Sequence, residues 1–455
     1  MSNRFRSASS PLDFAVDDGV KSKAMMLWLL LRCLCCLISL VLSFRFSNLI
    51  FFSTSTTTTA TANLYSAFHN SFLSVSTTKL TSMMTGETTE GGQSVMAQTT
   101  PNHTLTVSGW AAHDPSGNIT PYTFKRRENG VKDVTIEILY CGICHTDLHQ
   151  VRNDWGSTMY PIVPGHEITG IITKVGSNVS NFKVGDRAGV GCLAASCLNC
   201  EYCKDGQENY CDQLQFTYND IFWDGSITYG GYSKFLVADH RFVVRIPENL
   251  PMDAAAPLLC AGITVFNPLK DGNLLESRGK RIGIVGLGGL GHIAVKFAKA
   301  FGHHVTIIST SPSKEKEAKE RLGADDFIIS TNPEQMQSKS RTLDFILDTV
   351  SAEHSLGPIL ELLKVNGTLA IVGAPEKPLE LPSFPLIFGK RAVKGSIIGG
   401  IKETQEMLDA CGKHNITCEI EVVTPNQINE AFERLAKNDV KYRFVIDIAG
   451  KSSNL

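Results

Sequence analysis

Four cysteines with short, fixed gaps are the strongest chemical signal in the sequence. Residues 197–211 follow the pattern C-x2-C-x2-C-x7-C, formed by Cys197, Cys200, Cys203 and Cys211. Four thiolates at such gaps can converge on one tetrahedral zinc ion without leaving an open position, which predicts a structural zinc site. An iron–sulfur cluster is the competing metal group, since ferredoxins carry similar runs, and free or disulfide-bonded cysteines are the alternative without a metal. The sequence has no second run of this kind, so we favour zinc.

A second set of metal-binding residue types is dispersed along the chain. The stretch CGICHTDLHQ (residues 141–150) holds two cysteines and two histidines, VPGHEITG contains His166 beside Glu167, and PLLCAGIT contains Cys260. Cysteine and histidine are the ligands that zinc prefers. Taken singly, His166 also fits an ordinary loop histidine and Cys260 a buried, inert cysteine. Their spacing alone does not choose between these interpretations.

A glycine-rich turn follows an apolar strand pattern in RIGIVGLGGLGHIAVKFAKAFG (residues 281–302). Gly286, Gly288 and Gly291 form G-x-G-x-x-G before a helical pattern, with Gly289 inside the turn. Glycines let the backbone turn tightly and approach a pyrophosphate, which then lies at the helix N-terminus. In this strand–turn–helix context the motif predicts a dinucleotide-binding loop.

The end of the next strand, TIISTSPSKEKEA, indicates which dinucleotide binds. An NAD enzyme places Asp or Glu there for the ribose hydroxyls, whereas this chain has Thr310 between Ser309 and Ser311, with Lys314 close by. Hydroxyls and a cation suit a 2′-phosphate, which a carboxylate would repel. We therefore predict NADP(H) in preference to NAD; the alternative is a solvated Ser/Lys loop.

The composition is that of an ordinary globular protein. A chain of 455 residues is long enough for two or three domains, and its 19% charged and 43% hydrophobic residues are typical of such domains. The net charge of −2 gives no electrostatic reason to expect a nucleic acid partner. Zinc thiolates favour a reducing compartment, which predicts a cytoplasmic protein.

The first 95 residues differ from the rest of the chain. Residues 24–44 (AMMLWLLLRCLCCLISLVLSF) are long and apolar enough to span a bilayer, and a Ser/Thr-rich tract that we expect to be disordered follows them. One interpretation is a membrane anchor or an organelle-targeting sequence within residues 24–52. The other is that translation starts at Met96, since every chemical motif lies after it. A membrane is therefore a partner only if this extension is real.

Two kinds of periodicity divide residues 96–455. Short β-type runs (VTIEILY, GIITKVG, KFLVAD, FVVRIP) separated by Gly, Pro and Asn predict a mostly antiparallel domain up to residue 259. Apolar strands (RIGIVG, HVTIIST, DFILDTV, TLAIVGAP) then alternate with helical patterns, which predicts a parallel sheet covered on both faces. After residue 398, further helical patterns and YRFVIDI lead back to the first domain.

These motifs, in this order, resemble the zinc-dependent medium-chain alcohol dehydrogenases, especially the plant cinnamyl alcohol and mannitol dehydrogenase-like branch. The resemblance covers residues 96–448 and rests on CGICHTDLH, GHEITGIITKVGSNV, the four-cysteine run, PLLCAGIT and GLGGLG. It implies an α/β protein that forms a homodimer. Four segments are expected: an N-terminal extension (1–95), a GroES-like, mostly-β catalytic domain (96–259), a Rossmann domain with a doubly wound parallel sheet (260–398), and a return to the catalytic domain (399–455).

The resemblance also implies roles for individual residues. In this family a catalytic zinc is held by the cysteine of GIC, the histidine of GHE and the cysteine of PLLCAG, here Cys144, His166 and Cys260. Five further residues receive roles: Thr146 as a hydroxyl proton relay, His149 as the proton exit, Asp147 as the hydrogen-bonded support of the zinc ligands, Glu167 as a carboxylate that can approach the metal, and Thr264 as a contact of the nicotinamide.

The expected substrate pocket departs from that of the lignin-type cinnamyl enzymes. Those enzymes carry a Trp shortly after the last structural cysteine, where this chain has Phe216, and an aromatic residue near KGSIIGG, where Ile397 stands. The walls stay apolar, but the stacking preference for hydroxycinnamyl rings is weaker. Cinnamyl, other aromatic or allylic, and terpenoid alcohols therefore carry equal weight.

The sequence thus predicts an NADP-dependent zinc alcohol dehydrogenase that holds two zinc ions per chain and interconverts a primary alcohol and its aldehyde. One alternative is an iminium or alkene reductase of the same family, and the retention of Thr146 and His149 argues against it. Another is a non-catalytic zinc- or dinucleotide-binding protein, which the full set of expected catalytic ligands argues against.

Overall fold

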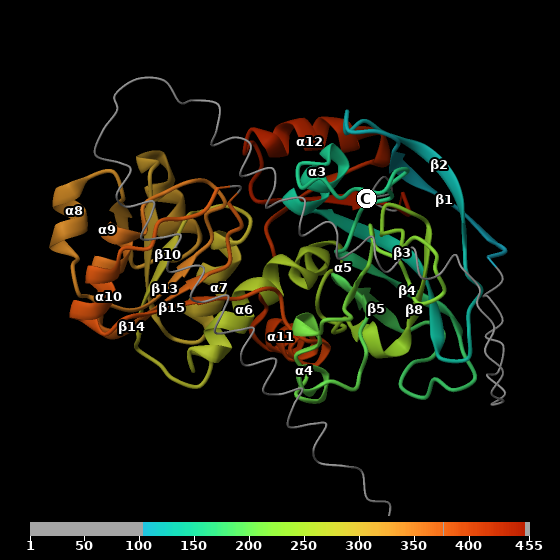
Figure 1. Ribbon diagram of the computed structural model, residues 1–455, viewed down its shortest axis with the longest axis horizontal. Helices are drawn as coiled ribbons and strands as arrows, with labels where there is room; N and C mark the ends of the chain where they lie inside the picture. Colours follow the sequence, from blue (N-terminus) through green and yellow to red (C-terminus); the bar gives the residue numbers. More distant parts are fainter. Residues whose placement is uncertain (1–102, 376, 451–455) are drawn as a thin grey trace, which may run out of the picture. The chain divides into compact units, whose positions relative to one another are not determined.

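Two large β-sheets organise the computed structural model, which describes residues 103–375 and 377–450 (Figure 1). One sheet is mostly antiparallel and the other is parallel, as the two sequence patterns predict. The expected extension, residues 1–95, lies outside the described residues. The domain boundaries at residues 96, 260 and 399 stay a prediction.

The antiparallel sheet is built around one long strand, β3 (Asp133–Ile143), whose apolar and β-branched side chains are buried on both faces. β3 pairs along one edge with β4 (Ile168–Val175), and along the other with β8 (Phe235–Asp239) and β17 (Arg443–Asp447). The seven-stranded sheet is completed by β5 (Arg187–Val190), β9 (Val244–Arg245) and β16 (Ile420–Val423). The C-terminal strand thus lies directly beside the strand that leads into CGICHTDLH. Two small hairpins accompany this sheet: β1 (Leu105–Ala112) with β2 (Ile119–Arg126), and β6 (Leu193–Ala195) with β7 (Gln215–Phe216).

The parallel sheet has six strands in the order β12-β11-β10-β13-β14-β15, which is the order of doubly wound dinucleotide-binding sheets. Alternate residues face two different cores: Ile282 and Ile284 of β10 join the larger core, and Val285 joins a smaller one. Both faces are therefore covered, which confirms the predicted doubly wound architecture. The strands are β10 (Arg281–Val285), β11 (His304–Ser309), β12 (Asp326–Ile329), β13 (Leu343–Asp348), β14 (Leu363–Ile371) and β15 (Ala392–Gly395).

Helices cover the sheets and connect them. α3 follows β3, α6 follows the PLLC segment, and α7 follows the glycine-rich turn. Their bounds are α3 (His145–Arg152), α4 (Glu201–Lys204), α5 (Met252–Ala255), α6 (Ala261–Asp271), α7 (Gly291–Ala300), α8 (Pro333–Ser338), α9 (Leu356–Glu361), α10 (Ser383–Gly389), α11 (Ile401–His414) and α12 (Ile428–Ala436).

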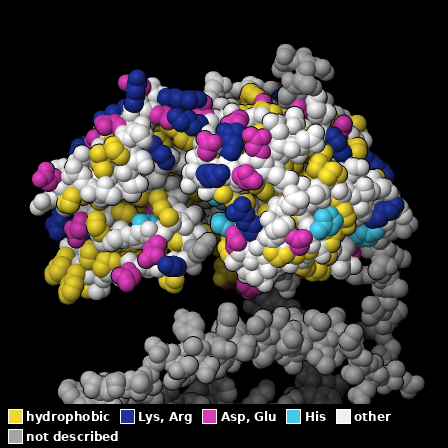
Figure 2. Space-filling model, turned by 90° about the horizontal axis from the view of Figure 1, so that it is seen from above, with side chains coloured by type: hydrophobic (Ala, Val, Ile, Leu, Met, Phe, Trp, Pro, Cys, Tyr) yellow, Lys and Arg dark blue, Asp and Glu magenta, His cyan; other side chains and the backbone are white. Residues whose placement is uncertain are grey.

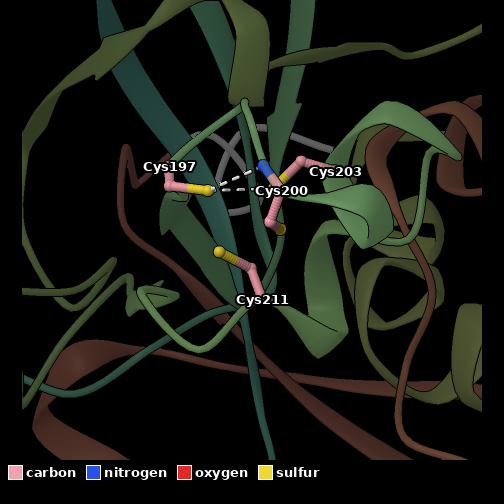
Figure 3. A group of neighbouring side chains, drawn as sticks. All are labelled: Cys197, Cys200, Cys203 and Cys211. Carbon is pink, nitrogen blue, oxygen red and sulfur yellow. Dashed lines mark hydrogen bonds between the residues drawn. The ribbon is translucent and has the colours of Figure 1, made fainter. Parts of the chain in front are cut away.

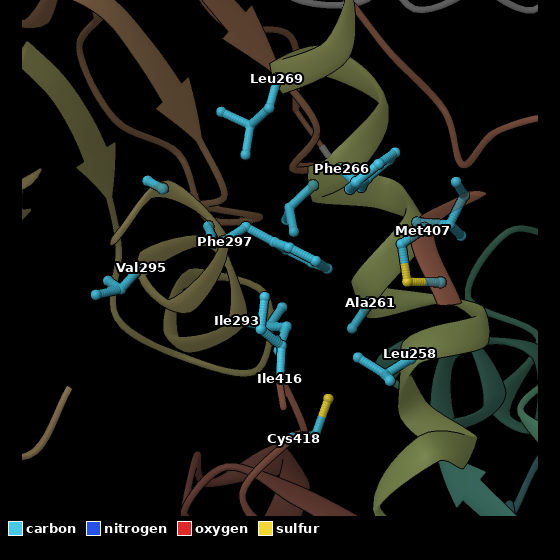
Figure 4. Close-up of a cluster of buried hydrophobic side chains, with 14 of the residues drawn as sticks. Leu258, Ala261, Phe266, Leu269, Ile293, Val295, Phe297, Met407, Ile416 and Cys418 are labelled. Carbon is cyan, nitrogen blue, oxygen red and sulfur yellow. The ribbon is translucent and has the colours of Figure 1, made fainter. Parts of the chain in front are cut away.

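The larger hydrophobic core joins α6, α7 and α11 (Figure 4). Phe266 of α6 meets Phe297 of α7 edge to face, with ring centroids 5.4 Å apart, and Met407 of α11 packs into the same core. Burying a side chain of this size stabilises a fold by roughly 1.5–3 kcal/mol. Because α6 begins after Cys260 and α7 begins at the glycine-rich turn, this packing holds a candidate metal ligand in register with the dinucleotide loop.

Within the described residues, no single helix has the length and apolar character needed to cross a bilayer. One bent pair of helical segments, Met252–Leu259 with Ala261–Asp271, has the length and the composition for this, and nothing else supports a membrane span there. Residues 24–44, on which the anchor interpretation rests, lie outside the described part of the chain.

Candidate metal centres and active site

The four cysteines of the run come together as their spacing predicts (Figure 3). Their sulfur atoms all lie within 4.8 Å of one another. Backbone N–H groups of Asn199 and Cys200 donate to the Cys197 sulfur at 3.4 and 3.3 Å, and these hydrogen bonds lower the pKa of Cys197 to about 6. Four converging thiols with backbone donors that favour the thiolate form fit a closed, tetrahedral zinc site.

The dispersed residues also assemble into one group. Cys144, His166, Glu167 and Cys260 each place a ligand atom within 4.8 Å of the others, and the sulfurs of Cys144 and Cys260 are 4.0 Å apart. The fold achieves this because Cys144 follows β3 while His166 and Glu167 precede β4, the neighbouring strand. Cys260 arrives from the turn before α6. Two thiols, an imidazole and a further carboxylate fit a zinc site that keeps a position open for substrate.

Asp147 contacts one of these ligands, His166, and the backbone around the group. Its buried carboxylate lies 3.3 Å from His166 Nδ1 and accepts hydrogen bonds from the backbone N–H groups of Cys144 (2.9 Å) and Gly165 (3.1 Å). The Tyr232 hydroxyl donates to it at 3.3 Å. A carboxylate on Nδ1 fixes the imidazole tautomer and leaves Nε2 to face the metal, as outer partners of zinc histidines do.

Glu167 is held by an arginine from the far end of the chain. Arg443 of β17 donates to Glu167 Oε1, and both side chains are buried. Burial raises the pKa of Glu167 to about 8, although the Arg443 cation opposes this shift. The second carboxylate oxygen, Oε2, is buried without a hydrogen-bond partner among the described residues. An orphaned buried oxygen at this place fits a group that binds or approaches a cation.

The glycine-rich loop has the geometry that a pyrophosphate needs. Gly286 follows β10 with φ of 88°, a conformation that favours glycine, and Gly291 lies too close to the Gly286 carbonyl oxygen to accept a Cβ. A Cβ on Gly288 would point into open space. His292 holds the loop from behind: its Nε2 accepts from the Glu419 N–H at 3.3 Å, so Nδ1 donates to the Gly288 carbonyl at 3.2 Å. Burial lowers the pKa of His292 to about 3, which keeps this tautomer neutral.

The predicted 2′-phosphate residues follow the adjacent strand. β11 pairs with β10, and Ser309 ends β11 with its hydroxyl accepting from the Ser311 N–H at 3.2 Å. Lys314 Nζ donates to the Leu287 carbonyl of the glycine-rich loop at 3.0 Å. Thr310 is exposed between the two serines. The structure therefore brings this cation and these hydroxyls to the edge where the dinucleotide loop lies.

The predicted relay and pocket residues are placed less tightly. Thr146 and His149 both lie on α3, and His149 Nδ1 pairs with Asp154 at 2.8 Å near the surface. Thr264 is buried on α6, one turn after Cys260. Phe216 and Ile397 are 43% and 49% exposed. The functional roles of five of these residues stay predictions: Thr146, His149, Thr264, Phe216 and Ile397.

Four residues next to these sites were not predicted from the sequence: Tyr232, Arg443, His292 and Cys192. Interaction with the Cys260 thiol lowers the pKa of Cys192. Arg443 did carry a signal, since an arginine inside the apolar strand YRFVIDI must find a buried partner. Tyr232 and His292 carried none, because only tertiary packing brings them to Asp147 and to the glycine loop.

Comparison with known proteins adds independent evidence. Residues 130–248 match the model of the alcohol dehydrogenase GroES-like domain, and residues 289–413 match that of the zinc-binding dehydrogenases. A probable cinnamyl alcohol dehydrogenase of Oryza sativa subsp. japonica is 70% identical over 357 residues, which cover 78% of this chain and 99% of that protein. The 8-hydroxygeraniol dehydrogenase of Catharanthus roseus is 58% identical over 347 residues, 76% of this chain and 96% of that protein. The crystal structure of CAD from Helicobacter pylori in complex with NADP(H) superposes with a TM-score of 0.71 at 40% identity, covering 76% of this chain and 99% of that one.

Proposed function

The chain belongs to the zinc-dependent alcohol dehydrogenase family, and we propose that it interconverts a primary aromatic, allylic or terpenoid alcohol and its aldehyde. It is an oxidoreductase of the cinnamyl alcohol dehydrogenase-like branch, and its cofactors are zinc and NADP(H). The observation that carries the proposal is the convergence of Cys144, His166 and Cys260 next to a dinucleotide loop.

The donor sets fit the two zinc ions. We assign the closed set of four thiols to a structural ion and the set of two thiols and an imidazole to a catalytic ion. When bound, the catalytic zinc supplies a Lewis acid that polarises the substrate oxygen, and NADP(H) supplies or accepts the hydride. Asp147 orients the imidazole of His166, and Glu167 stays poised beside the ligands through its contact with Arg443.

The proton of the alcohol needs a route to solvent. Thr146 and His149 are three residues apart on α3, so their side chains share a face of that helix. A hydroxyl can accept and donate at once, and an imidazole can carry a proton on either nitrogen. We assign Thr146 to the reacting oxygen and His149 to the exit, where Asp154 orients its ring.

The residues after β11 support NADP(H) over NAD. Ser309, Thr310, Ser311 and Lys314 provide hydroxyls and a cation where an NAD enzyme would need a carboxylate. The Helicobacter pylori relative was solved with NADP(H), which supports the same choice.

The substrate class follows from the relatives and the departures at Phe216 and Ile397. One close relative is a probable cinnamyl alcohol dehydrogenase and another is an 8-hydroxygeraniol dehydrogenase. Apolar walls without the full aromatic stack suit both an aryl and an isoprenoid chain. We therefore propose allylic primary alcohols, aromatic or terpenoid, as the common class.

Initial rates of NADPH and NADH consumption against a panel of aldehydes test this function. The panel holds coniferaldehyde, sinapaldehyde, cinnamaldehyde, citral, an iridoid-type dialdehyde and a sugar aldehyde. We expect turnover with NADPH, preferred over NADH by about tenfold or more because each charge-assisted bond to the 2′-phosphate is worth roughly 1.5–3 kcal/mol. The variant Lys314→Gln, which removes the cation, should lose most of that preference. If a folded protein that contains zinc turns over none of these aldehydes, the result would instead favour the iminium or alkene reductase or a binding protein.

The free edge of the parallel sheet supports a homodimer. β15 is the edge strand, and α10, which packs on the neighbouring strand β14, exposes Phe384, Ile387 and Phe388 by 69%, 68% and 72%. Hydrophobic side chains gather on the left of the molecular surface in Figure 2. An exposed strand edge next to a large apolar patch marks a protein interface. A second copy of this chain is the occupant that we propose, because an isologous pairing of two β15 edges covers both features at once.

Ile387→Glu should convert the dimer to a monomer. A glutamate buried against its symmetry mate lacks a partner, which we expect to weaken association by roughly a hundredfold or more. Light scattering after size-exclusion chromatography measures the mass. Val184→Glu, which changes a 63% exposed valine elsewhere, is the control and should stay dimeric. A wild-type monomer, or an Ile387→Glu dimer of wild-type affinity, would contradict the proposal.

A reducing compartment such as the cytoplasm suits this protein. The ten described cysteines are all free, and both candidate zinc sites need thiolate ligands. Anchoring or targeting through residues 24–52 concerns residues outside the described part of the chain.

A further inference from the structure

The turn between β13 and α9, residues 349–355, lies against the glycine-rich loop. Thr349 donates to the carbonyl of Val285, the last residue of β10, through both its backbone N–H (3.1 Å) and its hydroxyl (2.7 Å). A Cβ on Gly286 would lie 3.0 Å from the Thr349 hydroxyl oxygen and 3.0 Å from a methyl carbon of Val350. The turn is therefore part of the surroundings that hold the dinucleotide loop in place.

Asp348, the last residue of β13, anchors this turn from inside the protein. Its side chain is buried, and both carboxylate oxygens have contacts: Oδ1 accepts from the Val350 N–H at 3.1 Å, and Oδ2 lies 2.8 Å from Nε2 of His354. Its backbone carbonyl accepts from the N–H groups of Val372 (2.9 Å) and Gly373 (3.2 Å), which follow β14. One buried residue thus connects the turn, His354 and the end of the neighbouring strand.

The two contacts of the His354 ring need more protons than a neutral imidazole carries. Nε2 faces the Asp348 carboxylate, and Nδ1 lies 2.8 Å from the Ala352 carbonyl, so both ring nitrogens point at acceptors. A neutral imidazole has one N–H group. The pair of His354 and Asp348 must therefore hold one additional proton, on the ring or on the carboxyl group, to make both hydrogen bonds. The His354 side chain is 18% exposed, so solvent can exchange this proton.

Neighbouring charges do not replace this proton. Burial raises the pKa of Asp348, and the charge of the His354 ring opposes this rise. The residues that face the pair from the ends of β10 and β14 are uncharged. The charged groups beside the turn and on α9 have partners of their own: Glu353 lies 3.3 Å from Lys377, and Glu361 lies 3.3 Å from Arg391. Loss of the proton therefore leaves a buried negative charge on Asp348.

Losing the proton acts against a bound dinucleotide in two ways. One of the two hydrogen bonds of His354 is lost, so the turn is held less firmly against the glycine-rich loop. Asp348 also pairs in register with Val285, the residue before Gly286, so its uncompensated charge lies beside the loop and repels an anionic pyrophosphate. We propose that His354 is a positioning residue whose proton, shared with Asp348, holds the turn against the dinucleotide loop, so that the affinity for NADP(H) falls as the pH rises. This inference rests on the cofactor assigned above.

The Kd for NADPH, measured by fluorescence titration of the zinc-loaded protein between about pH 6 and about pH 9, tests the proposal in wild type and His354→Gln. A glutamine amide can donate to Asp348, but it does not titrate and it loses the contact with the Ala352 carbonyl. We expect the variant to bind about threefold to tenfold more weakly at about pH 6, which is the worth of one hydrogen bond. At about pH 9 it should bind nearly as wild type does, because both then keep one hydrogen bond. His113→Gln, which changes an exposed histidine after β1, is the matched control and should follow wild type at every pH.

Proton uptake gives a second readout, and His354→Asn gives a second variant if His354→Gln does not fold. Calorimetric titration with NADPH at about pH 8, in two buffers of different ionisation enthalpy, counts the protons bound with the cofactor; the 2′-phosphate is already ionised there. Linkage requires that a cofactor favoured by the proton also favours binding of the proton, so uptake should be smaller in either variant than in wild type.

Two outcomes would overturn the inference while the cofactor assignment stands. One is a ratio of variant to wild-type Kd that is the same at every pH, which would leave His354 with a structural role only. The other is equal proton uptake in wild type and variant. Failure of the folded wild type to bind NADPH at any pH would overturn the cofactor assignment itself, and this inference with it.

Discussion

Cys144→Ser is expected to abolish turnover while the protein stays folded. Losing a ligand removes the Lewis acid, whose contribution of several kcal/mol corresponds to a fall in kcat/KM of about a thousandfold or more. The fold should survive because Cys144 is the N-cap of α3, a position at which serine is among the preferred residues. The hydrogen bond from its backbone N–H to Asp147 is also retained.

Steady-state rates with the best aldehyde and NADPH measure this effect, together with the zinc content of the purified protein. We expect two zinc ions per chain in wild type and fewer in the variant. Cys141→Ala is the control: this neighbouring cysteine is buried in β3 and belongs to neither metal group, so zinc content should not change. Full activity of Cys144→Ser would disprove the zinc mechanism.

Cys203→Ser is expected to lower the stability of the protein sharply. Structural zinc sites contribute folding free energy directly, and we expect the free energy of unfolding to fall by more than about 4 kcal/mol. The loss of stability should extend beyond the cysteine loop, because hydrogen bonds attach this loop to a distant segment of the chain. The Asn209 amide donates to the Ile397 carbonyl at 2.9 Å, and Glu208 accepts from the Ile401 N–H at 3.2 Å. Releasing the loop therefore also releases the segment that carries the proposed pocket residue Ile397.

Thermal unfolding and zinc content of Cys203→Ser test the structural role, with Asn199→Ala as the matched control. Asn199 is exposed in the same loop, and only its backbone N–H contacts a cysteine, so the control should melt like wild type. Two zinc ions per chain and an unchanged Tm in Cys203→Ser would show that the four cysteines are not a structural site.

The sequence predicted the arrangement of candidate site residues best where these residues are close together in the chain. The four cysteines lie within 15 positions, and the glycine loop lies within six, so their geometry depends on short segments. The strands VTIEILY, RIGIVG, HVTIIST and DFILDTV appear as β3, β10, β11 and β13. The helix expected from HSLGPILELLK is shorter, because α9 ends at Glu361 and β14 already begins at Leu363.

The parts that sequence reasoning missed depend on distant packing or on very short elements. β12 and β15 have four residues each, too few for a period of two to be recognised, and only their neighbours β11 and β14 make them strands. Arg443 reaches Glu167 across 276 positions of the chain. The convergence of Cys144, His166 and Cys260 was itself inferred from a family resemblance, since nothing local brings these three residues together.

The position of Arg443 has a consequence for how the enzyme is loaded. Its guanidinium contacts Glu167 beside the candidate catalytic ion, and a Cβ on Gly289 of the dinucleotide loop would lie only 3.0 Å from its Nη1. One side chain is thus shared by two binding sites. Thermodynamic linkage requires that any factor by which the dinucleotide changes the affinity for zinc equals the factor by which zinc changes the affinity for the dinucleotide. Any coupling that Arg443 transmits between metal and cofactor is therefore equal in both directions, and the order in which they bind leaves the free energy of the fully loaded enzyme unchanged.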